Sequence, residues 1–389
     1  MGTNYFIEIS HSQIQKDGKE VCGDVFLSSK IKSENRSIAI LSDGLGSGIK
    51  ANVLATMTAS MAMNFTKINE PIDRTAEIIM NTLPVDSKRK ISYASFSILD
   101  IENTGETNIV EYGNPKFIMI RERENPQISE EIIKVRNKKI RLCKVDAQKQ
   151  DRIILFSDGV AQSGMGNDNM PFGWQNEALE KYVREEISKD KFISAQKLAT
   201  KIVNQANKND SYVSKDDITC SVIYFRKPRK LLVCTGPPYN KNSDARLANS
   251  IRRFDGKKVL CGGTTALIVS REMNKEIEVD IKSAVNGLPP LSYMEGVDLI
   301  TEGILTLGGV VKILENDANV YNIEKSPAGE LVKLFLYNDE INFIVGTKIN
   351  DAHQDPNLPV ELEIRRNVVK KIVRLLEEKY LKKVNVEYI

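Results

Sequence analysis

Histidine is nearly absent from this chain, whose 389 residues include two, His11 and His353. A hydrolase built on a Ser-His-Asp or Cys-His arrangement would need one of them, and neither lies in a recognisable motif. Cysteine is also scarce: there are five residues and no Cys-x-x-Cys pair, which disfavours a zinc site. We expect reduced, buried thiols. Any chemistry is therefore expected to depend on carboxylates.

No apolar run comes near the length of a membrane span, about 18 residues. The first ten residues, MGTNYFIEIS, carry neither a signal-peptide nor a myristoylation pattern. Net charge is +3, from 55 Lys and Arg against 52 Asp and Glu, so there is no basic excess of the kind that binds nucleic acid. We expect a cytoplasmic protein whose partners include neither nucleic acid nor a membrane. The length predicts two domains.

Many short strands in runs, with helices between them, make up residues 1–226. Apolar and polar residues alternate over 91–122, where Asn103-Thr104-Gly105 predicts a hairpin turn. Helical spacing of apolar residues is found at four places: 49–65, 71–83, 176–187 and 194–207. This pattern favours an α+β fold, in which two antiparallel sheets pack together with helices outside. A charged stretch that contains a proline, Arg226–Lys230, predicts the boundary with a second domain.

The second domain, residues 227–389, has a different pattern. Two apolar strands each enter a glycine-rich turn, and we expect an α/β domain. A long apolar segment, 294–315, predicts a helix loosened by glycines, and an amphipathic helix is expected over 360–381. Three acidic residues would share a solvated face of the first helix: Glu295, Asp298 and Glu302.

An apolar strand that ends on Ser-Asp-Gly occurs twice, at Ser42-Asp43-Gly44 and at Ser157-Asp158-Gly159. The glycines that follow Asp43 match neither a dinucleotide-binding fingerprint nor a P-loop. They are expected to let the backbone approach a ligand that the acid holds. An Asp-Gly pair after a strand is usually only a turn, and it is the repetition that favours a site.

Further acids lie at strand ends: Asp24 stands beside Gly23, and Asp216 and Asp217 directly precede an apolar strand. Clustered carboxylates repel one another and are costly to desolvate. Such a cluster is expected around divalent cations. Oxygen ligands and the shortage of histidine favour Mg²⁺ or Mn²⁺ over zinc.

Together the motifs GD, SDG-x-GSG, GNP, FSDG and DDIT, in this order over about residues 5–226, resemble the metal-dependent protein phosphatase (PPM) family. The nearest branch is the bacterial one typified by stage II sporulation protein E. The resemblance implies an α-β-β-α sandwich, in which each of two antiparallel sheets is flanked by helices. It also implies a signalling hydrolase that removes phosphate from phosphoserine and phosphothreonine in a protein substrate.

The resemblance further implies a set of ligands for two divalent cations, Mn²⁺ or Mg²⁺: Asp24, Asp43, the carbonyl group of Gly44, Asp158 and Asp216. Asp24 would hold one cation, and Asp43 would bridge both. Asp158 and Asp216 would hold the second cation, and Asp217 is not expected to be a direct ligand. Asp24 and Asp43 would thus serve catalysis through a metal-bound water, without a protein nucleophile.

The glycine-rich turns of the second domain are Gly236-Pro237-Pro238 and Gly262-Gly263-Thr264-Thr265. If helices begin just after them, their exposed amides could hold an anion such as a nucleotide phosphate. Ordinary tight turns are the alternative. By analogy with sensors joined to bacterial phosphatases, we expect a regulatory domain that binds a small molecule.

Two other functions compete with this hypothesis. The first domain could be a catalytically weak phosphatase scaffold that acts as a signalling or ligand-binding module, although all four acidic ligands are present. Alternatively, the second domain could carry the main activity, with the phosphatase controlling it. A homodimer is the oligomeric state we consider, and nothing in the sequence specifies it.

Overall fold

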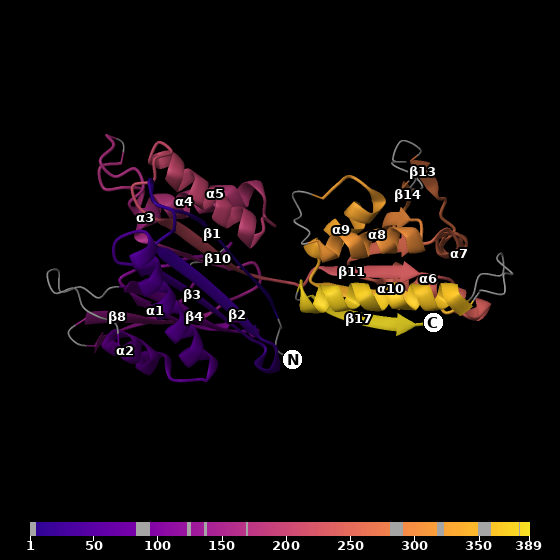
Figure 1. Cartoon of the computed structure of the whole chain (residues 1–389), viewed down its shortest axis with the longest axis horizontal. Coiled ribbons are helices and arrows are strands. Elements are labelled where there is room, and N and C mark those ends of the chain that lie inside the picture. Colours follow the sequence, from indigo (N-terminus) through magenta and orange to yellow (C-terminus); the bar gives the residue numbers. More distant parts are fainter. Residues whose placement is uncertain are drawn as a thin grey trace. The chain divides into compact units, whose positions relative to one another are not determined.

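The computed structural model describes the following residues: 5–82, 94–122, 126–135, 138–168, 170–280, 291–316, 323–348, 359–380 and 382–389. The chain separates into two compact units, Met1–Lys227 and Pro228–Ile389, here called the N-terminal and C-terminal units (Figure 1). All five cysteines are buried free thiols. Within the ranges above, no helix is both long and apolar enough to cross a bilayer.

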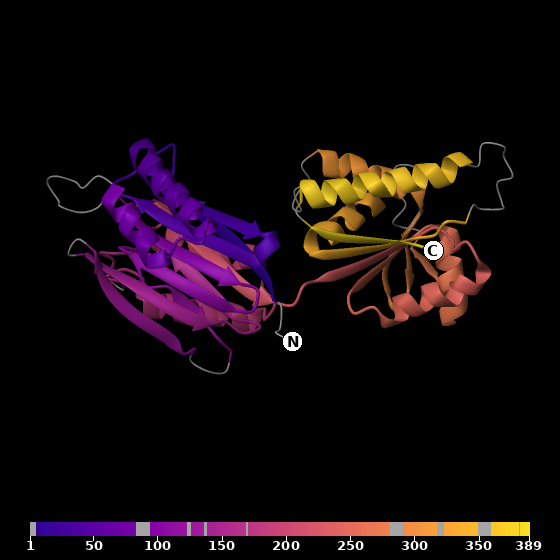
Figure 2. The same cartoon turned by 90° about the horizontal axis from the view of Figure 1, so that it is seen from below.

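The N-terminal unit contains two antiparallel sheets packed face to face (Figure 2). One has the strand order β1-β10-β9-β6: β1 (Phe6–Ile14), β10 (Ile218–Arg226), β9 (Arg152–Phe156) and β6 (Ile118–Ile120). The other has the order β2-β3-β4-β5-β8-β7: β2 (Asp24–Ile31), β3 (Arg36–Gly44), β4 (Ala94–Glu102), β5 (Glu106–Tyr112), β8 (Lys138–Asp146) and β7 (Ile128–Val135).

Helices cover the outer face of each sheet. The β3 sheet is covered by α1 (Ile49–Lys67) and α2 (Ile72–Thr82), and the β9 sheet by α4 (Gln175–Lys189) and α5 (Ala195–Asn209). The short helix α3 (Asp158–Ala161) follows β9. Because β3 is covered on both faces, eight of its nine residues are buried, which explains the apolar run over residues 38–41 in its centre. The predicted α-β-β-α sandwich is confirmed.

The C-terminal unit is built on a mixed sheet: β13 (Glu278–Asp280), β14 (Leu291–Met294), β15 (Val297–Thr301), β12 (Lys257–Cys261), β11 (Lys230–Thr235), β16 (Glu340–Val345) and β17 (Lys383–Tyr388). Strands β15, β12, β11, β16 and β17 are parallel, whereas β13 and β14 pair antiparallel at one edge. The α/β prediction for this part of the chain is confirmed.

Helices lie on both faces of this sheet (Figure 2). One face carries α6 (Asp244–Arg253) and α7 (Gly263–Met273), and the other carries α8 (Ile304–Glu315), α9 (Pro327–Tyr337) and α10 (Pro359–Glu378). The chain leaves β11 over one face toward β12 and returns from β15 over the other face to β16. The connections on the two sides of the β11–β16 pair therefore lie on opposite faces of the sheet. Open α/β sheets bind ligands outside the carboxyl ends of the strands at such a point.

The prediction of a helix over 294–315 is wrong for the first part of this segment. This part contains the turn and strand β15, and α8 begins only afterwards. Asp298 lies on β15 and forms an ion pair with Lys257 at 2.6 Å, so the expected acidic helix face does not exist. Four of the five residues of β15 are buried, and such a strand resembles a buried helix in sequence. Gly296, with φ of +86°, forms the turn that starts it.

Candidate functional site

Asp24 and Asp43 lie directly opposite each other on the paired strands β2 and β3. Side chains at opposite positions of antiparallel strands project to the same face, with Cβ atoms about 5 Å apart. Leu41, two residues before Asp43, belongs to the apolar layer between the two sheets. Because side chains alternate along a strand, both carboxyl groups project from the end of that layer toward the other sheet.

Asp158 and Asp216 come from the other sheet. Asp158 is the first residue of α3, two residues after the end of β9, and Asp216 lies in the turn before β10. β9 and β10 are antiparallel neighbours, and the amide of Ser157 donates a hydrogen bond to the carbonyl of Thr219 at 3.0 Å. The end of one strand and the start of the other therefore present their acids at the same end of the sandwich.

Asp43 lies close to acids from both sheets, because it stands opposite Asp24 and its side chain is hydrogen-bonded to that of Asp158. Burial raises the pKa of Asp43 well above the usual range, and four neighbouring carboxylates raise it further: Asp24, Asp158, Asp216 and Asp217. Charges shift the pKa of a buried group strongly only over short distances. The structure thus brings together the four acidic residues predicted as ligands, although they span most of the N-terminal unit in sequence.

Asp24 is buried, with 2% of its surface exposed. Burial raises its pKa, while interactions with the hydroxyl groups of Thr219 and Ser157 lower it. Its Oδ2 atom has no hydrogen-bond partner among the described residues. A buried carboxylate oxygen without a partner is unfavourable, and a bound cation would satisfy it.

Asp158 has partners that orient it. Burial and the charge of Asp216 raise its pKa, and hydrogen bonding to Asp43 lowers it. The Nε2 atom of Gln162, one turn further along, donates a hydrogen bond to its Oδ2 at 3.1 Å. Gln162 thus orients the carboxylate of Asp158, which also interacts with Asp43 on the other sheet.

Asp217 and Asp216 differ although they are adjacent. Asp217 is buried, and its Oδ1 accepts a hydrogen bond from the backbone amide of Lys16 at 3.0 Å. Asp216 is partly exposed, and its Oδ1 lies 3.8 Å from Nζ of Lys16. Lys16 is a residue of this site that the sequence analysis missed, because it lies in a polar stretch with no motif around it.

Several glycines at the site are required by packing. A Cβ atom on Gly44 would overlap the carbonyl oxygen of Ala51 in the first turn of α1, and one on Gly159 would overlap the carbonyl oxygen of Asp217. A Cβ on Gly23 would lie 2.7 Å from Oδ2 of Asp217. Close approach of backbone to backbone therefore explains Gly44 and Gly159, and close approach of the Asp217 carboxylate explains Gly23, in addition to any room for a ligand.

The donors at this site fit hard divalent cations. They are carboxylate oxygens, one of them buried and unpartnered, and their mutual repulsion calls for positive charge. Burial, together with the charge of Asp24, raises the pKa of the nearby Cys22 to about 12, which disfavours a thiolate ligand. In the described part of the chain, no group of three or more His, Cys, Asp or Glu side chains stands in an arrangement that could hold a metal ion.

The predicted anion-binding turn lies in the C-terminal unit, where β12 ends and α7 begins. Gly262 has φ of +121°, and Gly263 is exposed, with no atom within 4 Å of the position of a Cβ. The hydroxyl group of Thr265 is buried and has no hydrogen-bond partner within the described ranges. A Cβ on Gly262 would lie 3.4 Å from this hydroxyl, which therefore points back toward the turn. Thr264 lies between these residues in the first turn of α7.

Comparison with known proteins shows a family match that covers about half of the chain. Residues 33–226 match the model of the family described as Stage II sporulation protein E (SpoIIE). No curated protein sequence matches. Among solved structures, the phosphatase domain of the cell fate determinant SpoIIE from Bacillus subtilis is similar, with 14% identity, a TM-score of 0.44, and coverage of 58% of this chain and 95% of that chain.

Two further solved structures are similar over the same share of the chain. RsbX in complex with magnesium has 20% identity and a TM-score of 0.39, and the alignment covers 58% of this chain and 98% of that chain. The S. agalactiae serine/threonine phosphatase has 14% identity and a TM-score of 0.41, with coverage of 56% and 99%.

The family match begins just before β3 and ends with β10, so it contains Asp43, Asp158 and Asp216. Asp24 lies just before the matched segment, on the strand that pairs with β3. The sandwich fold and the order of the motifs agree with this match. The N-terminal unit of the chain therefore belongs to the stage II sporulation protein E family of metal-dependent protein phosphatases.

Proposed function

We propose that the N-terminal unit is a phosphoserine/phosphothreonine protein phosphatase that requires two divalent cations, Mn²⁺ or Mg²⁺. The observation that carries this proposal is the convergence of four acids from two sheets, seen in the charges that act on Asp43. Buried carboxylates at such short range need compensating positive charge. The family match is the second support, because the matched residues 33–226 include three of the four acids, Asp43, Asp158 and Asp216.

In this proposal the four acids Asp24, Asp43, Asp158 and Asp216 would hold the two cations, with the carbonyl group of Gly44 as a further ligand. Bound cations of this kind supply an activated water for attack on phosphorus and neutralise charge on the phosphoryl oxygens. The chain's own contribution is to fix the carboxylates. Direct pairing of β2 with β3 sets Asp24 against Asp43.

A phosphorylated protein is the substrate that we propose, in a cytoplasmic bacterial signalling system. Lys16 supports an anionic substrate, because its ammonium group lies beside Asp216 at the edge of the site with about a third of its side chain exposed. A cation in this position attracts a phosphoryl group. The amide of the same residue binds Asp217, so the β1–β2 loop is anchored at the site.

The test is hydrolysis of p-nitrophenyl phosphate by the full chain, with Mn²⁺ and with a chelator, for wild type and Asp43→Asn. We expect turnover only with the cation, and a loss of at least about 100-fold in kcat/KM for Asp43→Asn, since several kcal/mol of metal-based stabilisation would be lost. Asp146→Asn is the matched control, because Asp146 is an exposed residue at the end of β8 on the same sheet.

Turnover that does not require a divalent cation, or that Asp43→Asn leaves unchanged, would contradict the proposal. A folded protein that binds Mn²⁺ and shows no turnover on this ester or on a phosphoserine peptide would support the alternative, a catalytically weak scaffold. Faster hydrolysis of a phosphoserine peptide than of a phosphotyrosine peptide is expected for the stated substrate class.

For the C-terminal unit we propose a regulatory role through a small anionic ligand at Gly262–Thr265. Its support is the open space at Gly263 and the buried, unpartnered hydroxyl group of Thr265 at the start of an 11-residue helix. The diverging connections of the parallel sheet, between β11 and β16, favour a nucleotide as the ligand.

A further inference from the structure

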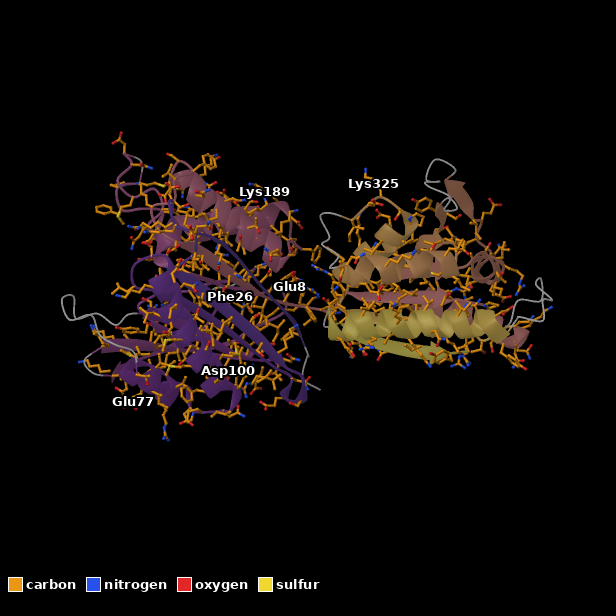
Figure 3. All side chains as sticks on the ribbon, in the orientation of Figure 1. Glu8, Phe26, Glu77, Asp100, Lys189 and Lys325 are labelled. Carbon is orange, nitrogen blue, oxygen red and sulfur yellow. The ribbon has the colours of Figure 1, made fainter. Side chains whose placement is uncertain are left out.

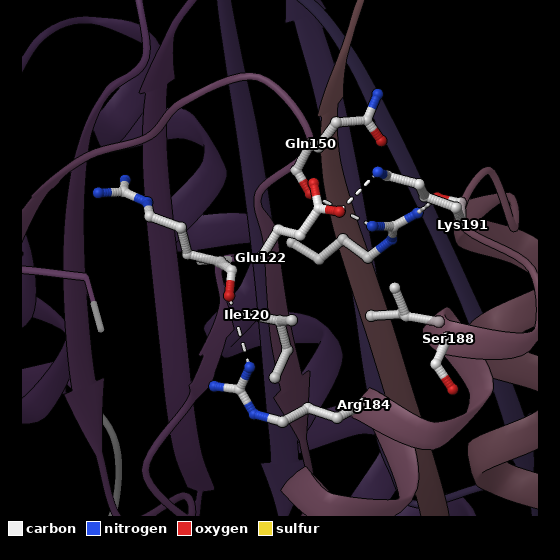
Figure 4. Close-up of a pocket in the computed structure, with 9 residues that line it drawn as sticks. Ile120, Glu122, Gln150, Arg184, Ser188 and Lys191 are labelled. Atoms are coloured by element: carbon white, nitrogen blue, oxygen red, sulfur yellow. Dashed lines mark hydrogen bonds and ion pairs between the residues drawn. The ribbon is translucent and has the colours of Figure 1, made fainter. Parts of the chain in front are cut away.

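A second pocket lies in the N-terminal unit, at the far end of β9 from the carboxylates. Its volume is about 300 Å³, and its lining comes from β6, the start of β9, the end of α4 and the loop after α4 (Figure 4). Arg152 is the first residue of β9, and Asp158 lies two residues beyond the last. At about 3.3 Å per residue, about 20 Å separates this pocket from the candidate metal centre.

Arg152 is a buried cation with no carboxylate partner among the described residues. Only 2% of its surface is exposed, and its guanidinium group stacks on the ring of Tyr224, 3.8 Å from the ring centroid. It donates hydrogen bonds to the carbonyl groups of Gln150 (3.2 Å), Lys191 (2.9 Å) and Ile193 (3.3 Å). Burial lowers its pKa. Carbonyl groups thus solvate this charge without neutralising it.

One N–H group of Arg152 has no hydrogen-bond partner in the described part of the structure. An arginine carries five N–H donors, and three of them are used by the carbonyl groups named above. Nε is buried without a partner. The nearby carboxylates have other partners, because Glu8 pairs with Arg226 at 2.5 Å and Asp190 pairs with Lys197 at 3.7 Å. A buried charge of this kind favours the approach of an anion.

The mouth of the pocket carries a second cation in a weak ion pair. Nζ of Lys191 lies 2.5 Å from Oε1 of Glu122, and the dashed line between them is visible in Figure 4. Both side chains are more than half exposed, at 55% and 53%. Exposed pairs contribute about 0–1 kcal/mol, so a ligand carboxylate or phosphate group could replace Glu122 beside Lys191.

The pocket also has apolar walls. Ile120 is buried at the end of β6, and Ile187 packs on the core beneath α4. The other arginines that line the pocket are already paired, Arg121 with Asp151 and Arg184 with Glu180. They contribute hydrocarbon surface to the walls rather than free charge. Small-molecule sites commonly combine such apolar walls with a few placed polar groups.

We propose that this pocket binds a small organic anion, with its carboxylate or phosphate group between Lys191 and Arg152 and its apolar part against Ile120 and Ile187. Binding displaces the carboxylate of Glu122 from Lys191. The site does not use the candidate metal centre, so its occupancy is independent of Mn²⁺ and of Asp43.

The test is calorimetric titration of the full chain, in the presence of a chelator and at fixed ionic strength, with benzoate, phenylphosphonate and the neutral benzamide. We expect one molecule of an aromatic anion to bind per chain and benzamide not to bind. The comparison of benzoate with phenylphosphonate distinguishes a carboxylate from a phosphate site. Lys191→Gln should weaken binding at least about fivefold, because it removes one of the two cations.

Glu122→Gln provides the sharpest outcome, because it should tighten binding about two- to fivefold by removing the competing carboxylate. A gain in affinity cannot result from misfolding. The matched control is Lys189→Gln, since Lys189 lies at the end of α4, 67% exposed, outside the pocket (Figure 3), and should leave affinity unchanged. Equal binding of benzamide, absence of binding by both anions, or indifference to both Lys191→Gln and Glu122→Gln would overturn the proposal.

Discussion

Glu111 is a buried carboxyl group that the candidate metal centre does not use. It lies on β5 with 2% of its surface exposed. Its Oε1 accepts a hydrogen bond from the amide of Phe117 at 3.0 Å, which closes the turn of the Gly-Asn-Pro motif, and its Oε2 lies 3.5 Å from Nη1 of Arg141. Burial raises its pKa to about 7, although Arg141 and the Phe117 amide lower it. This residue therefore makes folding depend on pH.

We predict that Glu111→Gln becomes more stable than wild type as pH rises. The folded-state pKa, about 7, lies above the ordinary value of 4.5, so the stability contributed by this group is present below about pH 4.5 and is lost as pH rises through about 7. Gln keeps the acceptor for Phe117 and cannot ionise. The difference in free energy of unfolding should change by up to about 3 kcal/mol between pH 4.5 and 8, measured by urea denaturation.

The control for this experiment is Glu106→Gln, at an exposed position on the same strand, where Glu106 pairs with Lys144 on the surface. The difference between this variant and wild type should change little over the same pH range, because exposed pairs contribute little. Titration of the clustered aspartates changes the free energy of unfolding of wild type and both variants equally, so it cancels in the differences. A difference for Glu111→Gln that stays constant with pH would rule out the proposed ionisation.

Helices α8 and α9 illustrate how an element depends on its neighbour. α8 contains two adjacent glycines in different surroundings. A Cβ on Gly308 would meet no atom within 4 Å, whereas a Cβ on Gly309 would lie 2.9 Å from Cβ of Ala328 in α9. Gly309 therefore permits the close contact of the two helices, and Gly308 has no such role.

We predict opposite effects of the two alanine substitutions on the stability of the C-terminal unit. Gly308→Ala should stabilise it by about 0.5–1 kcal/mol, because alanine restricts the unfolded chain and favours the helix. Gly309→Ala should destabilise it by about 1–2 kcal/mol, because α9 must move away despite the same helix preference. Urea denaturation followed by circular dichroism measures both, and each variant serves as the control of the other. Stabilisation by both substitutions would refute the packing argument.

At the scale of the whole molecule, the two units have separate hydrophobic cores. Buried clusters in the N-terminal unit involve the two sheets of the sandwich and their helices. Those of the C-terminal unit lie on the two faces of its own sheet, and among the described residues no cluster contains members of both units. The single tryptophan, Trp174, is buried in the N-terminal unit, so its fluorescence reports on the unfolding of that unit.

We predict that two ligands stabilise the two units separately. Mn²⁺ should raise the melting temperature followed by Trp174 fluorescence, because it neutralises the clustered carboxylates. If the turn at Gly263 binds a nucleotide phosphate, ADP should raise only the melting temperature of the C-terminal unit, on which Trp174 fluorescence does not report. At a ligand concentration of 100 times Kd, each stabilisation is about 2.7 kcal/mol, or several degrees.

Two variants check the assignment of these shifts. Asp43→Asn should reduce the shift with Mn²⁺ and leave the shift with ADP unchanged. Gly263→Val should do the reverse, because it places a side chain in the open space of the turn, where no atom lies within 4 Å and the fold can accept it. A shift with ADP that survives Gly263→Val would argue against an anion site at this turn, without bearing on the phosphatase.

Local sequence patterns determined the elements of the N-terminal unit and the chemistry of its site. Alternation, helical spacing and turn residues predicted the hairpin at Asn103-Thr104-Gly105, the helices and the sandwich, and strand-end acids with little histidine predicted hard divalent cations. The error at 294–315 has a local cause as well, because a strand buried on both faces and a buried helix have similar sequences.

Only the tertiary structure decided which residues meet. The register of β2 on β3 sets Asp24 opposite Asp43, and the packing of the second sheet brings Asp158 and Asp216 to them. The same holds for Lys16 at the candidate metal centre and for Arg152 in the pocket beside α4, neither of which stands in a motif. Pairing between strands depends on contacts between residues far apart in the chain. The alternation of apolar and polar residues along one strand does not specify which strand pairs with it. The sequence by itself therefore determined the elements and the donor chemistry, whereas long-range packing decided the geometry of both sites.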